Sequence, residues 1–146
     1  MMDETQVSFY DHVDDKLLKF AVILTKTKEK WVLCKHKDRE TYEVPGGHRE
    51  MDETILDTAK RELFEETGAV EYDIMPVCVY AIEDIHYFNG EKTFGMLYFA
   101  EVNAFEKELH SEIEKVLITD DLNVKWTYPE TQPKLITEAQ RRGILK

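Results

Sequence analysis

The chain has 146 residues, enough to bury a sizeable core, and we expect residues 1–146 to form a single domain. Its hydrophobic content of 42% and charged content of 34% are those of a soluble globular protein and argue against a disordered chain. The net charge of −11 argues against general binding to nucleic-acid duplexes, which requires a basic surface. It leaves open a single nucleotide, because metal ions can bridge phosphates to carboxylates.

The sequence also bears on where the protein works. It contains no run of 18 apolar residues, so we expect no membrane span. The acidic N-terminal residues lack the apolar core of a signal peptide, which predicts a cytoplasmic protein. Cys34 and Cys78 lie in apolar, strand-like runs. Because cytosolic thiols are usually reduced, we interpret both as core residues and not as a disulfide.

The first elements in chain order are two apolar runs. Residues 17–24 and 31–34 have the composition of strands, and the polar residues 25–30 between them are typical of a hairpin connection. Residues 42–44 then lead into Pro45-Gly46-Gly47, a strong turn signal.

The next element is a predicted helix of about four turns. Asp52 or Thr54 is suited to cap its N-terminus, and Gly68 fits the residue that ends it. The apolar stripe of this helix consists of Ile55, Ala59 and Leu63, broadened by Leu56 and Phe64.

The second half of the chain again alternates strands and turns before a last helix. The predicted elements are strands at 74–82 and 94–102 with a hairpin at 86–93, a short strand at 116–118, a loop at 126–129 and a helix at 131–142. Pro133 fits the first turn of that helix. This order predicts an α/β fold with a mixed sheet between helices.

Three carboxylates of the central helix carry the strongest chemical signal. Glu62, Glu65 and Glu66 stand at i, i+3 and i+4, so they project from one helix face. Like charges so placed repel one another unless a cation neutralises them. Mg²⁺ takes oxygen ligands and commonly binds one or two carboxylates together with substrate phosphates.

This cluster belongs to a longer pattern. Gly47 is followed after five residues by Glu53, and after seven more by Arg61-Glu62-Leu63-Phe64-Glu65-Glu66-Thr67-Gly68-Ala69. The segment 47–69 resembles the Nudix box at every defining position. The resemblance implies an α/β/α sandwich and hydrolysis of nucleoside diphosphates linked to another moiety.

The resemblance also implies a metal site. Glu65 and Glu66 match metal ligands, as does the carbonyl of Gly46. Glu62 matches the residue that serves as general base or as an additional ligand, and the family varies in which glutamate is the base. The expected cofactor is Mg²⁺, with Mn²⁺ as a substitute.

Two further box residues and one residue outside the box complete the expected site. Glu53 matches a carboxylate that supports the metal or the water, and Arg61 matches a residue that orients its neighbouring glutamate. The family often recruits one more acidic ligand from elsewhere, and Glu112 and Glu114 are candidates by position. Glu83 and Asp84 are weaker candidates.

Histidine and aromatic residues give weaker signals. His48 falls at a variable position of the box and is interpreted as a surface residue, and His36 and His86 are expected to be solvated. Most of the larger aromatic residues are expected in the core, with one or two free to stack on a base. They are Trp31, Tyr42, Tyr80, Tyr87, Phe88 and Tyr98.

The box specifies chemistry and leaves the substrate open. The segment from Tyr128 to Lys134 is similar to the ends of small bacterial Nudix triphosphatases that remove oxidised nucleotides. The leading hypothesis is cleavage of a nucleoside triphosphate, with an oxidised purine such as 8-oxo-dGTP as one candidate, to the monophosphate and pyrophosphate. The alternatives are a dinucleoside polyphosphate or nucleotide-sugar hydrolase and a non-catalytic nucleotide-sensing domain. A homodimer is expected only because family members are often dimers.

Overall fold

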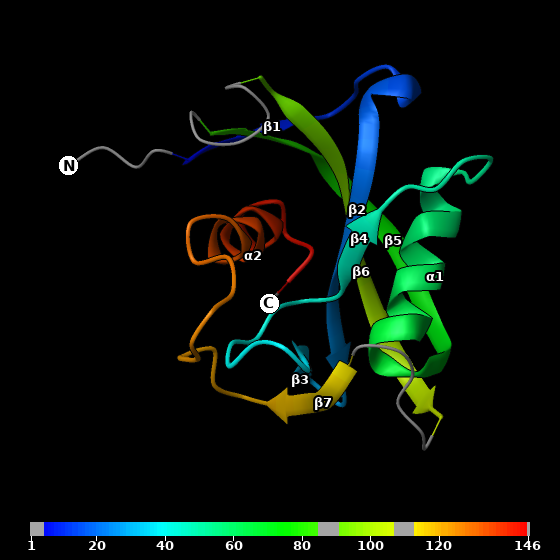
Figure 1. Ribbon diagram of the computed structural model, residues 1–146, viewed down its shortest axis with the longest axis vertical. Helices are drawn as coiled ribbons and strands as arrows, with labels where there is room; N and C mark the ends of the chain where they lie inside the picture. The colour runs from blue at the N-terminus through cyan, green and yellow to red at the C-terminus, as the bar shows by residue number, and fades with distance from the viewer. Residues whose placement is uncertain (1–4, 85–90, 107–112, 146) are drawn as a thin grey trace.

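The computed structural model describes residues 5–84, 91–106 and 113–145 (Figure 1). Seven strands, two α-helices and one short 3₁₀ helix are found in these ranges. The strands are β1 (Thr5–Tyr10), β2 (Leu18–Thr27), β3 (Lys30–His36), β4 (Gly46–His48), β5 (Ala69–Asp84), β6 (Thr93–Phe105) and β7 (Ile113–Thr119). The helices are η1 (Asp15–Leu17), α1 (Ile55–Thr67) and α2 (Gln132–Arg141).

The strands form one mixed sheet in the order β1-β5-β6-β2-β3-β7, and β4 pairs separately with β2. The β2–β6 pair is parallel, whereas the remaining pairs are antiparallel. Strand β2 pairs with β3 and β6 and also with β4. The Gly46–His48 backbone is therefore fixed beside the centre of the sheet. The expected mixed sheet is thereby confirmed.

The two helices cover opposite faces of this sheet (Figure 1). On one face, α1 contributes Ile55, Ala59 and Leu63 to a core with strand residues such as Ile23. On the other face, α2 contributes buried apolar side chains, including Leu135, to a second core. Each helix therefore buries one apolar stripe, which gives the α/β/α layering that the sequence predicted.

The box helix closely follows its local sequence signals. Thr54 is the N-cap, and its side chain and that of Asp57 form a reciprocal capping box. Asp52 is not the cap and lies in the preceding turn with a φ of 67°. Gly68 ends the helix in the left-handed region, at a φ of 78°. Leu56 is 38% exposed, so its expected place in the buried stripe is wrong.

Several strand boundaries differ from the predicted ones. The 25–30 segment is mostly strand, and only Lys28 and Glu29, both with positive φ, form the turn between β2 and β3. The predicted turn at Gly46-Gly47 is instead part of β4, since both glycines pair with β2 residues. Strand β1 was not predicted, and it pairs with β5 residues far along the chain.

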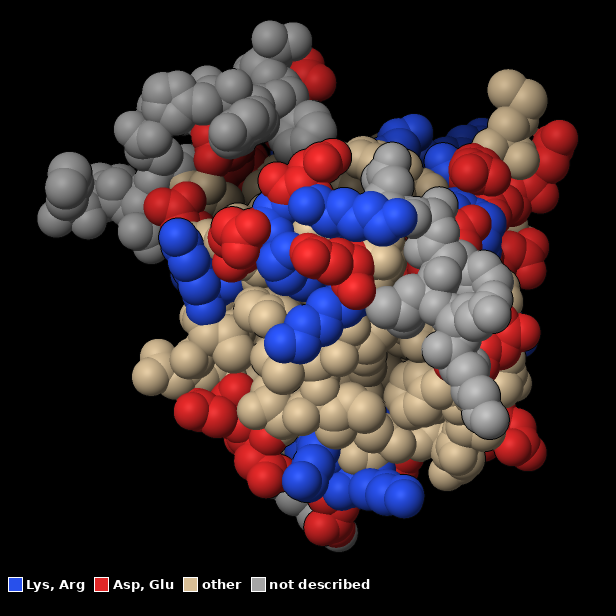
Figure 2. Space-filling model, turned by 60° about the horizontal axis from the view of Figure 1, so that its bottom comes forward, with Lys and Arg blue, Asp and Glu red and all other residues tan. Residues whose placement is uncertain are grey.

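The surface carries charged side chains of both signs. On the face drawn in Figure 2, Lys and Arg side chains are interleaved with Asp and Glu side chains around a broad uncharged area. Among the helices in the described ranges, none is long and apolar enough to cross a membrane. Cys34 and Cys78 are free and buried, as expected.

Candidate active site

The carboxylate-bearing face of α1 lies against strand β4. A Cβ atom at Gly47 would come within 2.4 Å of the carboxyl carbon of Glu62, so this carboxylate occupies the space a side chain would fill. Glycine at position 47 thus permits Glu62 to approach the β4 backbone closely. Gly47 and the Glu62 carboxylate therefore pack directly against each other.

Glu66 makes the second contact between α1 and β4. Its Oε1 accepts a hydrogen bond of 2.7 Å from the backbone N–H of Gly46. In an extended strand the N–H and C=O of one residue point to the same side, so the Gly46 carbonyl also faces the Glu66 side. The structure therefore brings the predicted carbonyl and carboxylate ligands to one place.

Arg61 links four of the acidic residues. Its Nε and Nη2 donate to the two oxygens of Glu53, at 2.7 and 3.1 Å, in a fork-like pair. Its Nη1 donates to Glu62 at 2.6 Å and to Glu65 at 3.4 Å, and lies 3.7 Å from Glu50. One guanidinium therefore fixes the direction of several carboxylates.

The electrostatic environments of these carboxylates differ. Burial, with a contribution from Glu62, raises the pKa of Glu66 to about 8. Burial also raises the pKa of Glu62 despite its bond to Arg61. In contrast, the hydrogen bond from Arg61 and the backbone N–H of Glu50 lower the pKa of Glu53 to about 2. Glu62 and Glu66 are thus the carboxylates whose charged form is disfavoured by burial, and the donor set fits a hard divalent cation.

His36 extends the site, and its expected solvated position is wrong. Its Nε2 lies 2.7 Å from Glu43 and 2.9 Å from Glu66, and only 22% of its side chain is exposed. Arg39 in turn donates to both oxygens of Glu43. A set of four metal-compatible ligand atoms within 4.8 Å of one another comes from Cys34, His36, Glu43 and Glu66. No local spacing in the sequence predicted this cluster, because β3 and α1 meet only in the folded chain.

The candidate ligands outside the box have separate locations. Glu112 lies outside the described residues, as does His86. Glu114 forms an ion pair with Lys35, and Glu83 lies 3.8 Å from Lys92. Asp84 is buried and accepts a hydrogen bond from Thr5. None of these three described residues is among those that contact the Glu62 and Glu66 carboxylates.

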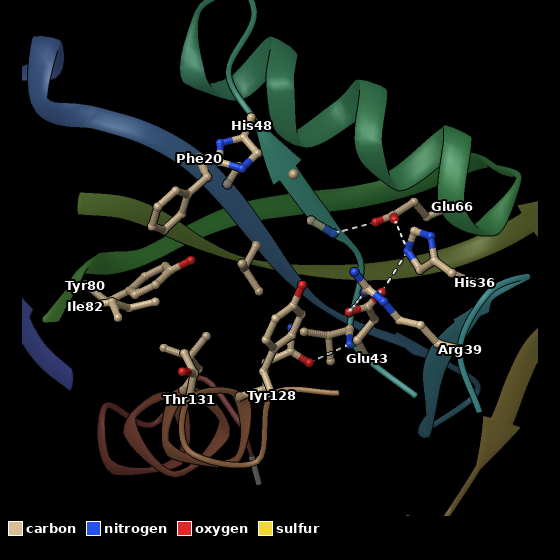
Figure 3. A pocket seen from close by; sticks show the side chains of 17 residues that line it. Phe20, His36, Arg39, Glu43, His48, Glu66, Tyr80, Ile82, Tyr128 and Thr131 are labelled. Atoms are coloured by element: carbon tan, nitrogen blue, oxygen red, sulfur yellow. Dashed lines mark hydrogen bonds and ion pairs between the residues drawn. The ribbon is translucent and has the colours of Figure 1, made fainter. Parts of the chain in front are cut away.

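A cavity of about 390 Å³ opens beside Glu66, Gly46 and Gly47 (Figure 3). It lies between the sheet and the start of α2, and Phe20, Tyr80 and other apolar or aromatic side chains form much of its wall. His48 is exposed, as expected, but it also lines this cavity with its ring at 6.1 Å from that of Phe20. A small molecule in the cavity would reach the carboxylate cluster at one end.

Comparison with known proteins adds family information to this geometry. Residues 15–139 match the NUDIX domain family. YtkD of Bacillus subtilis (strain 168), provisionally assigned as an 8-oxo-dGTP diphosphatase, is 31% identical over 110 residues. That alignment covers 70% of this chain and 62% of YtkD, so the chain spans less than two thirds of the relative's length.

Two crystal structures of similar proteins were compared as well. The Bacillus subtilis pyrophosphohydrolase BsRppH superposes with a TM-score of 0.79 at 24% identity, over 97% of this chain and 93% of that chain. A MutT NUDIX hydrolase from Burkholderia pseudomallei gives a TM-score of 0.65 at 21% identity, over 82% and 95% of the respective chains. At these identities the similarity shows a shared fold.

Proposed function

Since this chain belongs to the Nudix hydrolase family, we propose that it is a divalent-metal-dependent pyrophosphohydrolase that cleaves a nucleoside triphosphate to the monophosphate and pyrophosphate. The observation that carries the proposal is the contact of Glu62 and Glu66 with the Gly46-Gly47 backbone at the end of a nucleotide-sized cavity. In this proposal the phosphates of the bound nucleotide lie at the carboxylate end of the cavity, where a metal ion would join them to the carboxylates.

The proposed metal ligands are Glu65, Glu66 and the Gly46 carbonyl, with Glu62 as base or additional ligand. Bound Mg²⁺ or Mn²⁺ would neutralise phosphoryl oxygens and lower the pKa of a bound water. The raised pKa of Glu66, caused mainly by burial, supports this assignment because a bound cation would stabilise the charged carboxylate. Glu112 stays a proposed additional ligand.

The remaining box residues have supporting roles in this proposal. Where Glu62 serves as the base, it would accept the proton of the attacking water, and burial makes it a stronger base by raising its pKa. Arg61 would hold Glu62 in place, and Glu53 would hold Arg61 through its two hydrogen bonds. The fork of Arg61 is suited to this task because it fixes two carboxylates at defined angles.

The proposed substrate is a nucleoside triphosphate with an oxidised purine as the leading base. The assignment of YtkD as an 8-oxo-dGTP diphosphatase supports this choice, as does the similarity of the Tyr128–Lys134 segment to small triphosphatases. Dinucleoside polyphosphates and nucleotide sugars are the nearest alternative substrates.

The first experiment measures pyrophosphate and phosphate release from a nucleotide panel with Mg²⁺ and with EDTA. The panel contains ordinary and oxidised triphosphates, dinucleoside polyphosphates and nucleotide sugars. We expect metal-dependent pyrophosphate release from a triphosphate. Turnover of only the other two classes would contradict the proposed substrate, and absence of all turnover from folded, Mg²⁺-binding protein would favour nucleotide sensing.

Substitution of the two proposed ligands tests the site itself. The double variant Glu65→Gln and Glu66→Gln should lower the Mg²⁺-dependent rate by about 100-fold or more, because the carboxylate charge is removed while the side-chain shape is kept. Glu71→Gln, at an exposed position of β5, is the matched control and should retain activity. Circular dichroism would verify that both variants fold. Undiminished turnover in the double variant would show that the metal assignment is wrong.

A further inference from the structure

The cavity beside the carboxylate cluster contains a second group of polar side chains at the α2 end. Gln132 is the first residue of α2 and is only 5% exposed, yet it lines the cavity. Its Oε1 accepts a hydrogen bond of 2.9 Å from the backbone N–H of Val44. Because that partner is a donor, the amide oxygen must face Val44, and the amide nitrogen is left as a donor for another group.

Tyr80 is the second such residue. It lies on β5, is 1% exposed, and packs its ring 5.6 Å from that of Phe20. In Figure 3 its hydroxyl points into the cavity, toward the space between the Phe20 and Tyr128 rings. Gly95 makes this packing achievable, because a Cβ atom there would come within 2.9 Å of the Tyr80 ring.

Neither group has a partner at its free end among the residues that the structure describes. Within residues 5–84, 91–106 and 113–145, no hydrogen bond is found for the Gln132 amide nitrogen or the Tyr80 hydroxyl. Every fully buried side-chain nitrogen and oxygen in those ranges does have a partner. The two unpaired atoms therefore retain access to the cavity that both residues line. A nearly buried polar group without a partner is costly, and a ligand would supply the missing bond.

The cavity walls indicate the shape of that ligand. Phe20, Tyr80 and Ile82 form one side, and Tyr128 from the loop before α2 lies opposite (Figure 3). Flat aromatic and aliphatic surfaces of this kind suit a heterocyclic base, which stacks on aromatic rings regardless of its identity. Polar atoms at the edge of the base then determine which base is accepted.

We propose that Gln132 and Tyr80 recognise the base of the nucleotide, and that the Gln132 amide nitrogen selects a 6-oxopurine over a 6-aminopurine. This inference rests on the proposed function, because it places a nucleotide in the same cavity with its phosphates at Glu66. The amide nitrogen can only donate, so it matches the carbonyl oxygen of a 6-oxopurine and opposes the N–H groups of a 6-aminopurine. The Tyr80 hydroxyl can donate or accept, so it adds affinity at the edge of either base.

The decisive variant is Gln132→Glu. It preserves the side-chain size and the acceptor for Val44 N–H, but it replaces the amide donor with a carboxylate acceptor. We expect wild type to bind inosine monophosphate about 10- to 100-fold more tightly than adenosine monophosphate, a range typical of one directional polar contact. Gln132→Glu should abolish or reverse this preference. Gln140→Glu, an exposed glutamine of the same helix, is the matched control and should leave the preference unchanged.

Tyr80→Phe provides a second test that keeps the ring and removes only the hydroxyl. We expect weaker binding of both monophosphates with little change in their ratio, and an unaltered affinity for Mg²⁺. This variant keeps the proposal falsifiable if Gln132→Glu does not fold. Equal binding of the two bases by wild type would overturn the proposal, as would an unchanged preference in folded Gln132→Glu or unchanged affinities in Tyr80→Phe.

The readouts separate this inference from the proposed function. Monophosphate binding requires no turnover, whereas pyrophosphate release from inosine and adenosine triphosphates with Mg²⁺ reports hydrolysis. A base preference that depends on Gln132 without any pyrophosphate release would support the inference and contradict the proposed function. Pyrophosphate release by a wild-type protein that shows no base preference would support the proposed function and contradict this inference.

Discussion

At the scale of single residues, the two glycines of β4 are constrained in different ways. The space beyond Gly47 is taken by the flexible end of the Glu62 side chain, with the carboxyl carbon 2.4 Å from an added Cβ. The space beyond Gly46 is taken by backbone, with the Ala21 carbonyl oxygen at 2.6 Å. A side chain can move aside at low cost, whereas a paired strand cannot, so the two positions should respond differently to alanine.

We therefore predict that Gly47→Ala impairs catalysis and Gly46→Ala impairs folding. The Gly47 change should displace Glu62 and lower kcat/KM by about tenfold or more, with little loss of stability, because the proposed base or additional ligand is moved from its position. The Gly46 change should lower the free energy of unfolding by about 1–3 kcal/mol, as overpacking does in well-packed interiors. Denaturant unfolding and steady-state kinetics on both variants would check this. Equal loss of stability in the two variants would contradict the prediction.

At the scale of elements, the box helix was predictable because its signals are local. Thr54, the apolar stripe through Leu63, and Gly68 all act within one helix length. Strand β1 was not predicted because its partners on β5 are distant in the sequence, from Thr5 with Asp84 to Tyr10 with Val79, and its own six residues have no strong pattern. The bonds of His36 to Glu43 and Glu66 were missed for the same reason. Sequence spacing can reveal one helix face but cannot show which strand lies against it.

The N-terminal cap of α1 leads to the next prediction. The Thr54 hydroxyl accepts from the Asp57 N–H at 3.0 Å, and the Asp57 carboxylate accepts from the Thr54 N–H at 3.1 Å. Thr54→Ala should lower the free energy of unfolding by about 1 kcal/mol, because helix N–H groups lose their acceptor. Thr137→Ala, an exposed threonine inside α2, should cost less than about 0.5 kcal/mol. Chemical denaturation would compare them, and equal losses would exclude a specific capping effect.

At the scale of the whole molecule, the cavity belongs to both layers of the sandwich. The carboxylate end is built by α1 and β4, and the other end is built by α2 and the sheet. The sequence predicted the first end from one continuous motif. It placed Gln132 only within a segment of weak similarity and left Tyr80 among the core aromatics, because their convergence depends on the tertiary fold. The docking of α2 therefore affects the shape of the cavity end that we propose to bind the base.

The anchoring of α2 is in part electrostatic. Glu138 is buried, accepts two hydrogen bonds from Arg141 at 2.8 and 2.6 Å, and accepts one from Arg142 at 2.8 Å. Arg142 also donates to Asp11, at 3.0 Å, which connects the helix to the segment after β1. The hydrogen bond from Arg141 is the main cause that lowers the pKa of Glu138 to about 2.

This lowered pKa predicts how stability depends on pH. Because the folded pKa of Glu138 is below its unfolded value of about 4.3, its contribution is complete above that value and is lost as the pH falls toward 2. Glu138→Gln should therefore reduce the free energy of unfolding by about 1–2 kcal/mol at pH 7, and by progressively less between pH 4 and pH 2. Urea unfolding of both proteins at several pH values would measure the difference, with Glu71→Gln as the control for loss of one charge. A stability difference that stays constant from pH 7 to pH 2 would show that Glu138 acts through packing and not through its charge.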